Sequence, residues 1–199
     1  MVAGDDEQGP QSAAPRRALL KQAAGGLAGL AALAVSGCGA AAKAPQQSVK
    51  HAPQPVRSGD VAVLNSLLDL ERRTVAAYTA GLPLLLRPEA RTARQFLDEE
   101  LEHTGELLSL IKAAEGVPSA RQPSYDLGHP RTPDDVLALL HGLERAQVAA
   151  YLAAIPRLSP GVVRAAVASI LTSDAQHLAI LRLAQGQVAA PSAFVTGRD

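Results

Sequence analysis

The chain has few aromatic residues and a single cysteine. Aromatic residues make up only 3% of its 199 residues, Trp is missing, and the lone Cys38 excludes a disulfide bond within the chain. A core with so few large rings has to be built from Leu, Val, Ala and Ile, whose side chains suit the close packing of helices. Because 47% of the residues are hydrophobic, the chain can still bury one sizeable core. The composition therefore predicts one all-helical domain.

The chain also has no excess of positive or negative charge. Lys plus Arg and Asp plus Glu number 19 each, and no stretch interleaves basic and aromatic residues in the way that nucleic-acid-binding surfaces do. Nucleic acid is therefore excluded as a partner. Long apolar runs are also scarce, and the run from Gln22 to Val35 is too short to cross a bilayer as a mature helix.

The first 37 residues resemble an export signal and not a part of the fold. Arg16 and Arg17 form a twin-arginine pair ahead of that apolar run, which ends in Val-Ser-Gly before Cys38 and so resembles the lipobox of bacterial lipoproteins. We expect residues 1–37 to be a twin-arginine lipoprotein signal peptide, Cys38 to be lipidated, and residues 38–58 to be a flexible tether. The predicted location is the outer face of the cytoplasmic membrane, with the lipid as anchor. An ordinary signal with a chance cysteine is the alternative.

The remainder of the chain carries an internal repeat. The segment Glu71-Arg-Arg-Thr-Val-Ala-Ala-Tyr78 returns 73 residues later as Glu144-Arg-Ala-Gln-Val-Ala-Ala-Tyr151. Each copy is followed, at nearly the same distance, by a carboxylate residue that stands three positions before a histidine. These two pairs are Glu100 with His103 and Asp174 with His177. The repeated unit is therefore a single glutamate followed by a carboxylate and histidine pair.

Apolar residues at steps of three and four predict four helices within residues 59–190. Capping residues, prolines and glycines that mark the helix ends are Asp60, Pro88, Thr132, Pro160 and Gly186. Residues 116–131 contain Gly and Pro without any period, which predicts a long connection between the second and third helices. Residues 191–199 are expected to form a short, non-helical tail.

The repeated acids and histidines fall inside the apolar stripes of the four helices. Burying an ionised carboxylate without a compensating charge costs several kcal/mol, and no Lys or Arg shares those stripes. Two divalent cations would balance four carboxylates, and carboxylate and imidazole groups bind such ions in helix bundles. The residues predicted to bind metal are Glu71, Glu100, His103, Glu144, Asp174 and His177. A site for one ion and an empty bundle are the alternatives.

Neighbouring residues add to this pattern. Tyr78 and Tyr151 each follow a single glutamate by one heptad, where they either hydrogen-bond a metal-binding carboxylate or fill the core with the hydroxyl satisfied elsewhere. Glu99 and the other acids beside the second-helix pair are expected on its water-facing side. Arg72 is rotated about 100° from its neighbour Glu71 and is expected to face solvent.

At these residues the chain resembles the ferritin-like superfamily of di-iron and di-manganese carboxylate proteins, and within it a bacterial ferritin-like group related to desiccation-associated proteins. The similarity covers residues 60–197 and includes the segment Val148-Ala-Ala-Tyr151. It implies an all-α, ferritin-like four-helix bundle built from two repeated helix pairs. By the family's pattern, Glu71 and Glu144 are the single carboxylates of the first and third helices, and each carboxylate and histidine pair completes one half-site.

The chain departs from the family's pattern at one position. Asp174 stands where the family usually has Glu, and its side chain is one methylene shorter. The half-site of Asp174 and His177 is therefore expected to be the weaker of the two.

The resemblance also implies a cofactor and a type of chemistry. Two divalent metal ions are expected, iron ahead of manganese, with chemistry on oxygen or peroxide of the ferroxidase, peroxidase or oxidase type. The expected partners are these ions, oxygen or peroxide, the membrane through the lipid anchor, and a second copy of the chain in a homodimer. A non-catalytic metal-binding or structural bundle of the cell envelope, with a degenerate site, is the alternative. No cysteine cluster of a redox partner is present, so whether the protein is an enzyme stays open at this point.

Overall fold

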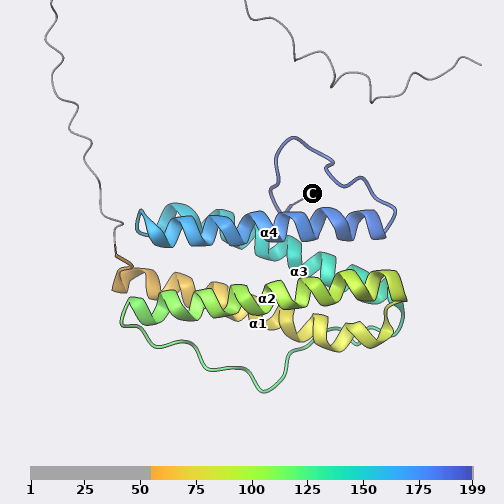
Figure 1. The fold of residues 1–199 in the computed structure, drawn as a ribbon, viewed down its shortest axis with the longest axis horizontal. Coiled ribbons are helices and arrows are strands. Elements are labelled where there is room, and N and C mark those ends of the chain that lie inside the picture. Colours follow the sequence, from red (N-terminus) through yellow and green to blue (C-terminus); the bar gives the residue numbers. More distant parts are fainter. Residues whose placement is uncertain (1–54, 199) are drawn as a thin grey trace, which may run out of the picture. The chain divides into compact units, whose positions relative to one another are not determined.

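Four α-helices form the fold of residues 55–198, the part of the chain that the computed structural model describes (Figure 1). They are α1 (Val61–Gly81), α2 (Arg87–Ala113), α3 (Pro133–Ala154) and α4 (Val162–Ala184). Short 3-10 turns lie at Ser58–Asp60, Leu82–Leu84 and Ile155–Arg157. The described residues form no strand, so the predicted all-α four-helix bundle is confirmed.

The predicted signal peptide, the lipidated Cys38 and nearly all of the tether lie outside the described residues. They stay predictions. Within residues 55–198, no helix has both the length and the apolar character needed to cross a bilayer.

The repeat in the sequence is a repeat of helix pairs. α1 packs along α2, α3 packs along α4, and α1 contacts α3 between the two pairs (Figure 1). Residues 114–132 run back along the outside of the first pair, so α3 starts at the same end of the bundle as α2 (Figure 1). The long connection therefore lies between the second and third helices, as predicted.

Local signals in the sequence set the helix ends. The Thr132 hydroxyl accepts a hydrogen bond of 3.1 Å from the backbone N–H of Asp135, whose carboxylate accepts one of 3.0 Å from the backbone N–H of Thr132. This reciprocal pair caps α3. At the end of α4, Gly186 has a positive φ of 69°, and the N–H of Gln187 bonds to the carbonyl of Arg182, as in a Schellman motif.

α2 ends in the same motif, but with a residue poorly suited to it. Glu115 has a φ of 57°, and the N–H of Gly116 bonds to the carbonyl of Ile111 at 2.9 Å. Because a Cβ atom disfavours this left-handed conformation, we expect Glu115→Gly to raise the free energy of unfolding by about 0.5–1 kcal/mol. Urea denaturation measures this difference. Glu115 is exposed, so a lower midpoint in the variant would contradict the prediction.

Polar side chains fasten the long connection to α1. Arg72 donates a hydrogen bond of 2.7 Å to the carbonyl of Ser119, and Asn65 donates to the carbonyl of Val117 and accepts from the N–H of Ser119. The side chain of Arg72 is consequently only 10% exposed. The expectation that Arg72 faces solvent is wrong, because the connection covers this side of α1.

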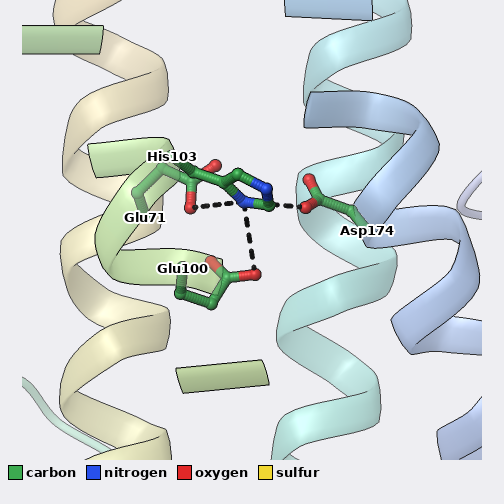
Figure 2. A group of neighbouring side chains, drawn as sticks. All are labelled: Glu71, Glu100, His103 and Asp174. Carbon is green, nitrogen blue, oxygen red and sulfur yellow. Dashed lines mark ion pairs between the residues drawn. The ribbon is translucent and has the colours of Figure 1, made fainter. Parts of the chain in front are cut away.

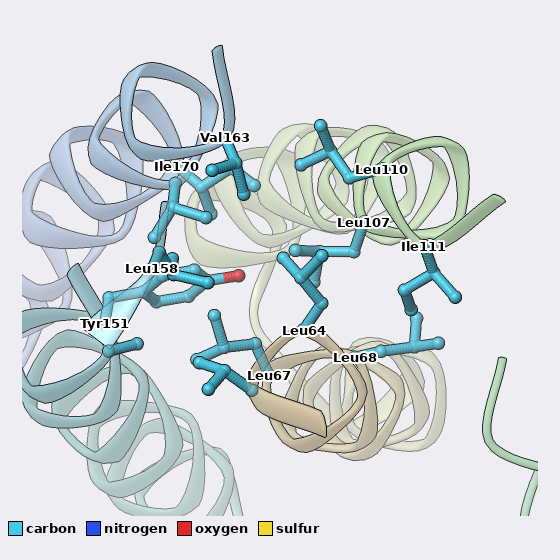
Figure 3. Packing of buried hydrophobic residues seen from close by; sticks show 13 residues of the cluster. Leu64, Leu67, Leu68, Leu107, Leu110, Ile111, Tyr151, Leu158, Val163 and Ile170 are labelled. Carbon is cyan, nitrogen blue, oxygen red and sulfur yellow. The ribbon is translucent and has the colours of Figure 1, made fainter. Parts of the chain in front are cut away.

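Two apolar clusters fill the bundle, one toward each end. The first contains Leu64, Ile111 and Tyr151 (Figure 3), and the second contains Phe96 and Tyr78. On each helix, the repeated acids and histidines lie between these clusters in sequence. A polar layer is therefore enclosed between two apolar ones.

The segment after α4 contains no helix within the described residues, yet it packs on the bundle. Gly197 is buried with a φ of 66°, and a Cβ atom there would lie 2.4 Å from the backbone carbonyl oxygen of Arg145 in α3. Only glycine fits this close approach to a helix backbone.

Candidate metal centre

All six residues predicted to bind metal meet in the polar layer. α1 and α3 contribute one carboxylate each, whereas α2 and α4 contribute a carboxylate and a histidine on one helix face. The four carboxylates are 0% exposed and His177 is 1% exposed, while the His103 side chain is 11% exposed. The six residues are Glu71, Glu100, His103, Glu144, Asp174 and His177.

The first group of donors gathers around His103 (Figure 2). The Nδ1 atom of His103 lies 3.4 Å from Asp174 Oδ1, 3.7 Å from Glu100 Oε1 and 3.9 Å from Glu71 Oε2. One ligand atom from each of these four residues lies within 4.8 Å of the others. Because bonds from a metal ion to oxygen or nitrogen are about 2.0–2.2 Å long, this spacing suits four ligands of one ion.

The second group gathers around His177. Its Nδ1 atom lies 3.3 Å from Glu100 Oε1 and 3.3 Å from Glu144 Oε1. With Asp174 these residues form another set of four within the same 4.8 Å limit. Glu100 and Asp174 belong to both groups, so they are the residues that two bound ions would share. The sequence did not reveal which carboxylates could bridge.

The two tyrosines form hydrogen bonds between the two repeats. The Tyr78 hydroxyl donates a hydrogen bond of 2.6 Å to Glu144 Oε1, and the Tyr151 hydroxyl donates to Glu71 Oε1. Each tyrosine thus holds the single glutamate of the other repeat. Of the two interpretations of these residues, the structure shows the one in which the hydroxyl bonds a carboxylate of the site.

A second crossing contact escaped the sequence reasoning. The Thr74 hydroxyl donates a hydrogen bond of 2.8 Å to Gln147 Oε1, and Gln147 Nε2 donates one of 3.0 Å to Glu100 Oε2. Both Thr74 and Gln147 are buried. They occupy matching positions in the repeat, three residues after Glu71 and Glu144. The occurrence of polar residues at the same position in both repeats was the signal in the sequence that could have identified Thr74 and Gln147.

Glu99 is the clearest departure from expectation. It was expected on the water-facing side of α2, but its Oε2 atom lies 2.6 Å from Nε2 of His177 on α4. Its side chain is 35% exposed. The expectation is wrong because Glu99 lies where α2 approaches α4, a contact that no pattern within α2 reveals.

Burial and mutual repulsion shape the protonation of the metal-free cluster. Burial, followed by the charge of Glu100, raises the pKa of Glu71 well above its ordinary value. The same causes raise the pKa of Glu144 from 4.5 to about 7 and that of Asp174 in the same direction. Burial alone would lower the pKa of His177, but contacts with Glu100, Glu144 and Glu99 raise it to about 11. The cluster therefore holds protons that cations would displace.

The unpaired atoms of the cluster test whether metal ions fit. Each of the six residues has a buried polar atom without a hydrogen-bond partner, and a buried unpaired group costs about 1–3 kcal/mol. These atoms are Glu71 Oε2, Glu100 Oε1, His103 Nδ1, Glu144 Oε2, both carboxylate oxygens of Asp174, and His177 Nδ1. Oxygen and imidazole nitrogen donors of this kind are suited to divalent iron and manganese. The residues present therefore fit a pair of divalent ions.

Four helices around a buried layer of carboxylates and histidines define a helix-bundle protein with a candidate metal centre. A family model described as a ferritin-like domain matches residues 59–187, so the chain belongs to the ferritin-like domain family. Among solved structures, a conserved hypothetical protein, rv2844, from Mycobacterium tuberculosis is similar, with a TM-score of 0.62 at 18% identity over 69% of this chain and 97% of that chain. At this identity the likeness concerns the fold alone. No curated protein matches the chain.

Proposed function

We propose that this protein binds a pair of divalent metal ions in its polar layer and uses them for oxidoreductase chemistry. The observation that carries the proposal is the set of unpaired, buried ligand atoms on all six residues of the cluster. Among the described residues, only protons and ion pairs within the cluster itself offset this burial when metal is absent. Iron is proposed ahead of manganese.

The chain's own residues have distinct tasks at such a centre. One ion would be held by the group around His103 and the other by the group around His177. Tyr78 and Tyr151 orient the glutamates, and burial together with nearby carboxylates raises the pKa of both tyrosines well above the usual value. They therefore remain protonated and serve as hydrogen-bond donors. Two metal ions of this kind, when bound, supply a redox centre for oxygen or peroxide.

The surroundings of this centre in the cell are part of the proposal. The twin-arginine pair and Cys38 support export and a lipid anchor on the outer face of the cytoplasmic membrane. Metal ions, oxygen or peroxide, and the membrane are the proposed partners, together with a second copy of the chain in a homodimer.

A second candidate function is a bundle that holds metal without turnover. The burial of the site favours it, since only His103 among the six residues has more than 1% exposure. The buried carboxylates are not accessible to a substrate larger than oxygen or peroxide.

Elemental analysis of the full-length chain tests the proposal. The chain is supplied with limiting Fe²⁺ or Mn²⁺, desalted and compared with Glu71→Gln and Glu144→Gln variants. About two ions per chain, reduced in both variants, are expected for a two-ion centre. Consumption of oxygen or peroxide by the loaded chain then separates the catalytic candidate from the non-catalytic one. Metal content near zero in the parent chain would refute both.

A further inference from the structure

The two histidines of the centre occupy equivalent positions in the repeat but have unequal surroundings. His103 and His177 both direct Nδ1 toward the carboxylates of the layer. The other ring nitrogen of His177 contacts Glu99 at 2.6 Å. The residue that corresponds to Glu99 in the second repeat is Ser173, which directly precedes Asp174 as Glu99 precedes Glu100. Serine is too short to take the same part, and its side chain carries no charge.

Glu99 determines which ring nitrogen of His177 is available to a metal ion. Its carboxylate accepts the hydrogen on Nε2 of His177. Nδ1 is therefore the nitrogen that binds an ion, after the hydrogen on Nδ1 has been displaced. A negative charge at the outer nitrogen also makes the ring a stronger donor. His103 gains neither effect.

A second contact holds His177 in position. The ring of Phe96 stacks on the His177 ring, with centroids 4.0 Å apart and planes 25° apart. Phe96 is 3% exposed, so a buried ring covers one face of the imidazole while Glu99 contacts its Nε2 atom. In the other repeat the corresponding residue is Ile170, which offers no ring to stack on. Orientation of His177 is thus set before an ion arrives.

We infer that Glu99 is a positioning residue that makes the two halves of the centre unequal, so that the group around His177 takes up a divalent ion before the group around His103. This inference rests on the proposed function. It reverses the expectation that the half-site of Asp174 and His177 is the weaker one. Asp174 belongs to both groups, so its shorter side chain affects both and does not single out one.

Titration of the metal-free, full-length chain with Mn²⁺ tests the inference. Calorimetry and the electron paramagnetic resonance signal of free Mn²⁺ together give two dissociation constants. We expect them to differ by at least ~10-fold, because loss of an outer hydrogen bond to a metal-binding histidine typically costs ~10–100-fold in affinity. In Glu99→Ala the tighter constant should weaken by that factor while the weaker one stays in place.

Matched variants assign the steps and separate positioning from general structural damage. His177→Ala should remove the tighter step and His103→Ala the weaker one. Glu99→Gln keeps an acceptor oxygen but loses the charge, so it should restore part of the affinity that Glu99→Ala loses. Glu102→Ala removes an exposed acid from the same helix and should leave both constants unchanged. Helical circular dichroism checks that each variant is folded, and Glu99→Gln carries the test if Glu99→Ala is not.

Different results overturn different statements. Two equal constants in the parent chain, or an equal effect of Glu99→Ala on both steps, would refute the unequal halves while leaving a two-ion centre intact. Loss of the weaker step in His177→Ala would refute the order of loading. A parent chain that binds no Mn²⁺ and no Fe²⁺ would refute the proposed function itself.

Discussion

The metal-free protein is expected to lose stability as the pH rises from about 5 to about 8, whereas the metal-loaded protein is expected to gain it. Burial, with the charge of Glu100, raises the pKa of Glu144 from 4.5 to about 7, and the pKa values of Glu71 and Asp174 shift in the same direction. A raised pKa means that the folded chain binds more protons than the unfolded chain. The stabilisation is therefore complete below the unfolded pKa and is lost as the pH rises through the folded one.

His177 adds to the same trend at higher pH. Despite its burial, its contacts with Glu100, Glu144 and Glu99 raise its pKa from 6.5 to about 11. Its contribution is present below pH 6.5 and disappears as the pH rises toward 11. Burial would raise the pKa of Glu100, but its contacts with Glu71, His103 and His177 lower it below 4.5. The contribution of Glu100 is therefore already complete at about pH 5 and does not oppose this direction.

The expected size of the effect is several kcal/mol. For Glu144 alone, the shift from 4.5 to about 7 corresponds to about 3 kcal/mol. Metal ions compete with the same protons, so their binding strengthens as the pH rises. Free metal at a thousand times its dissociation constant would stabilise the fold by about 4 kcal/mol.

Thermal unfolding with and without a chelator measures how stability changes with pH in the metal-free and the metal-loaded protein. The midpoint is recorded at several pH values between about 5 and 8, in chelator or in excess Mn²⁺. Glu144→Gln removes one of the responsible carboxylates and should flatten the metal-free slope, whereas Glu102→Gln, on the surface of α2, should not. Parallel curves with and without metal would show that the cluster does not bind the ion.

The repeat made the clustering of these six side chains predictable from the sequence. Glu71 and Glu144 stand in apolar stripes of period 3.6, so their side chains had to face the core, and the spacing of three put each carboxylate and histidine pair on one face. Two related helix pairs then bring matching positions together at mid-bundle. Their roles as metal ligands remain predictions, although the structure brings all six side chains into one layer.

Contacts between helices were beyond the reach of sequence periodicity. Glu99 is polar and lies beside the stripe of α2, so its own helix assigns it to water, and only the approach of α4 brings it to His177. Arg72 was misplaced for the same reason, since the covering segment around Ser119 follows it by 47 residues. The burial of a residue at the border of a stripe depends on which element packs against it, and therefore on the whole fold.

Glu100→Gln is expected to weaken both metal-binding steps, whereas each single glutamate should affect only one. Glu100 lies in both groups of donors, Glu71 only in the group of His103, and Glu144 only in the group of His177. Gln has nearly the shape of Glu, so Gln147 keeps a nearby oxygen to bond, as it does at 3.0 Å to Glu100 Oε2. The change thus removes charge with little effect on packing.

The three variants form a matched set because each replaces one fully buried carboxylate by a neutral amide. In Mn²⁺ titrations, Glu71→Gln should remove the weaker step and Glu144→Gln the tighter one, while Glu100→Gln shifts both by more than the ~10–100-fold expected from loss of an outer hydrogen bond. Circular dichroism checks that Glu100→Gln stays folded without metal, because His177 loses one of its charged partners. Loss of affinity in a chain that stays folded would then come from the missing shared ligand. If Glu100→Gln weakened one step only, Glu100 would belong to a single ion, and the two groups would not share it.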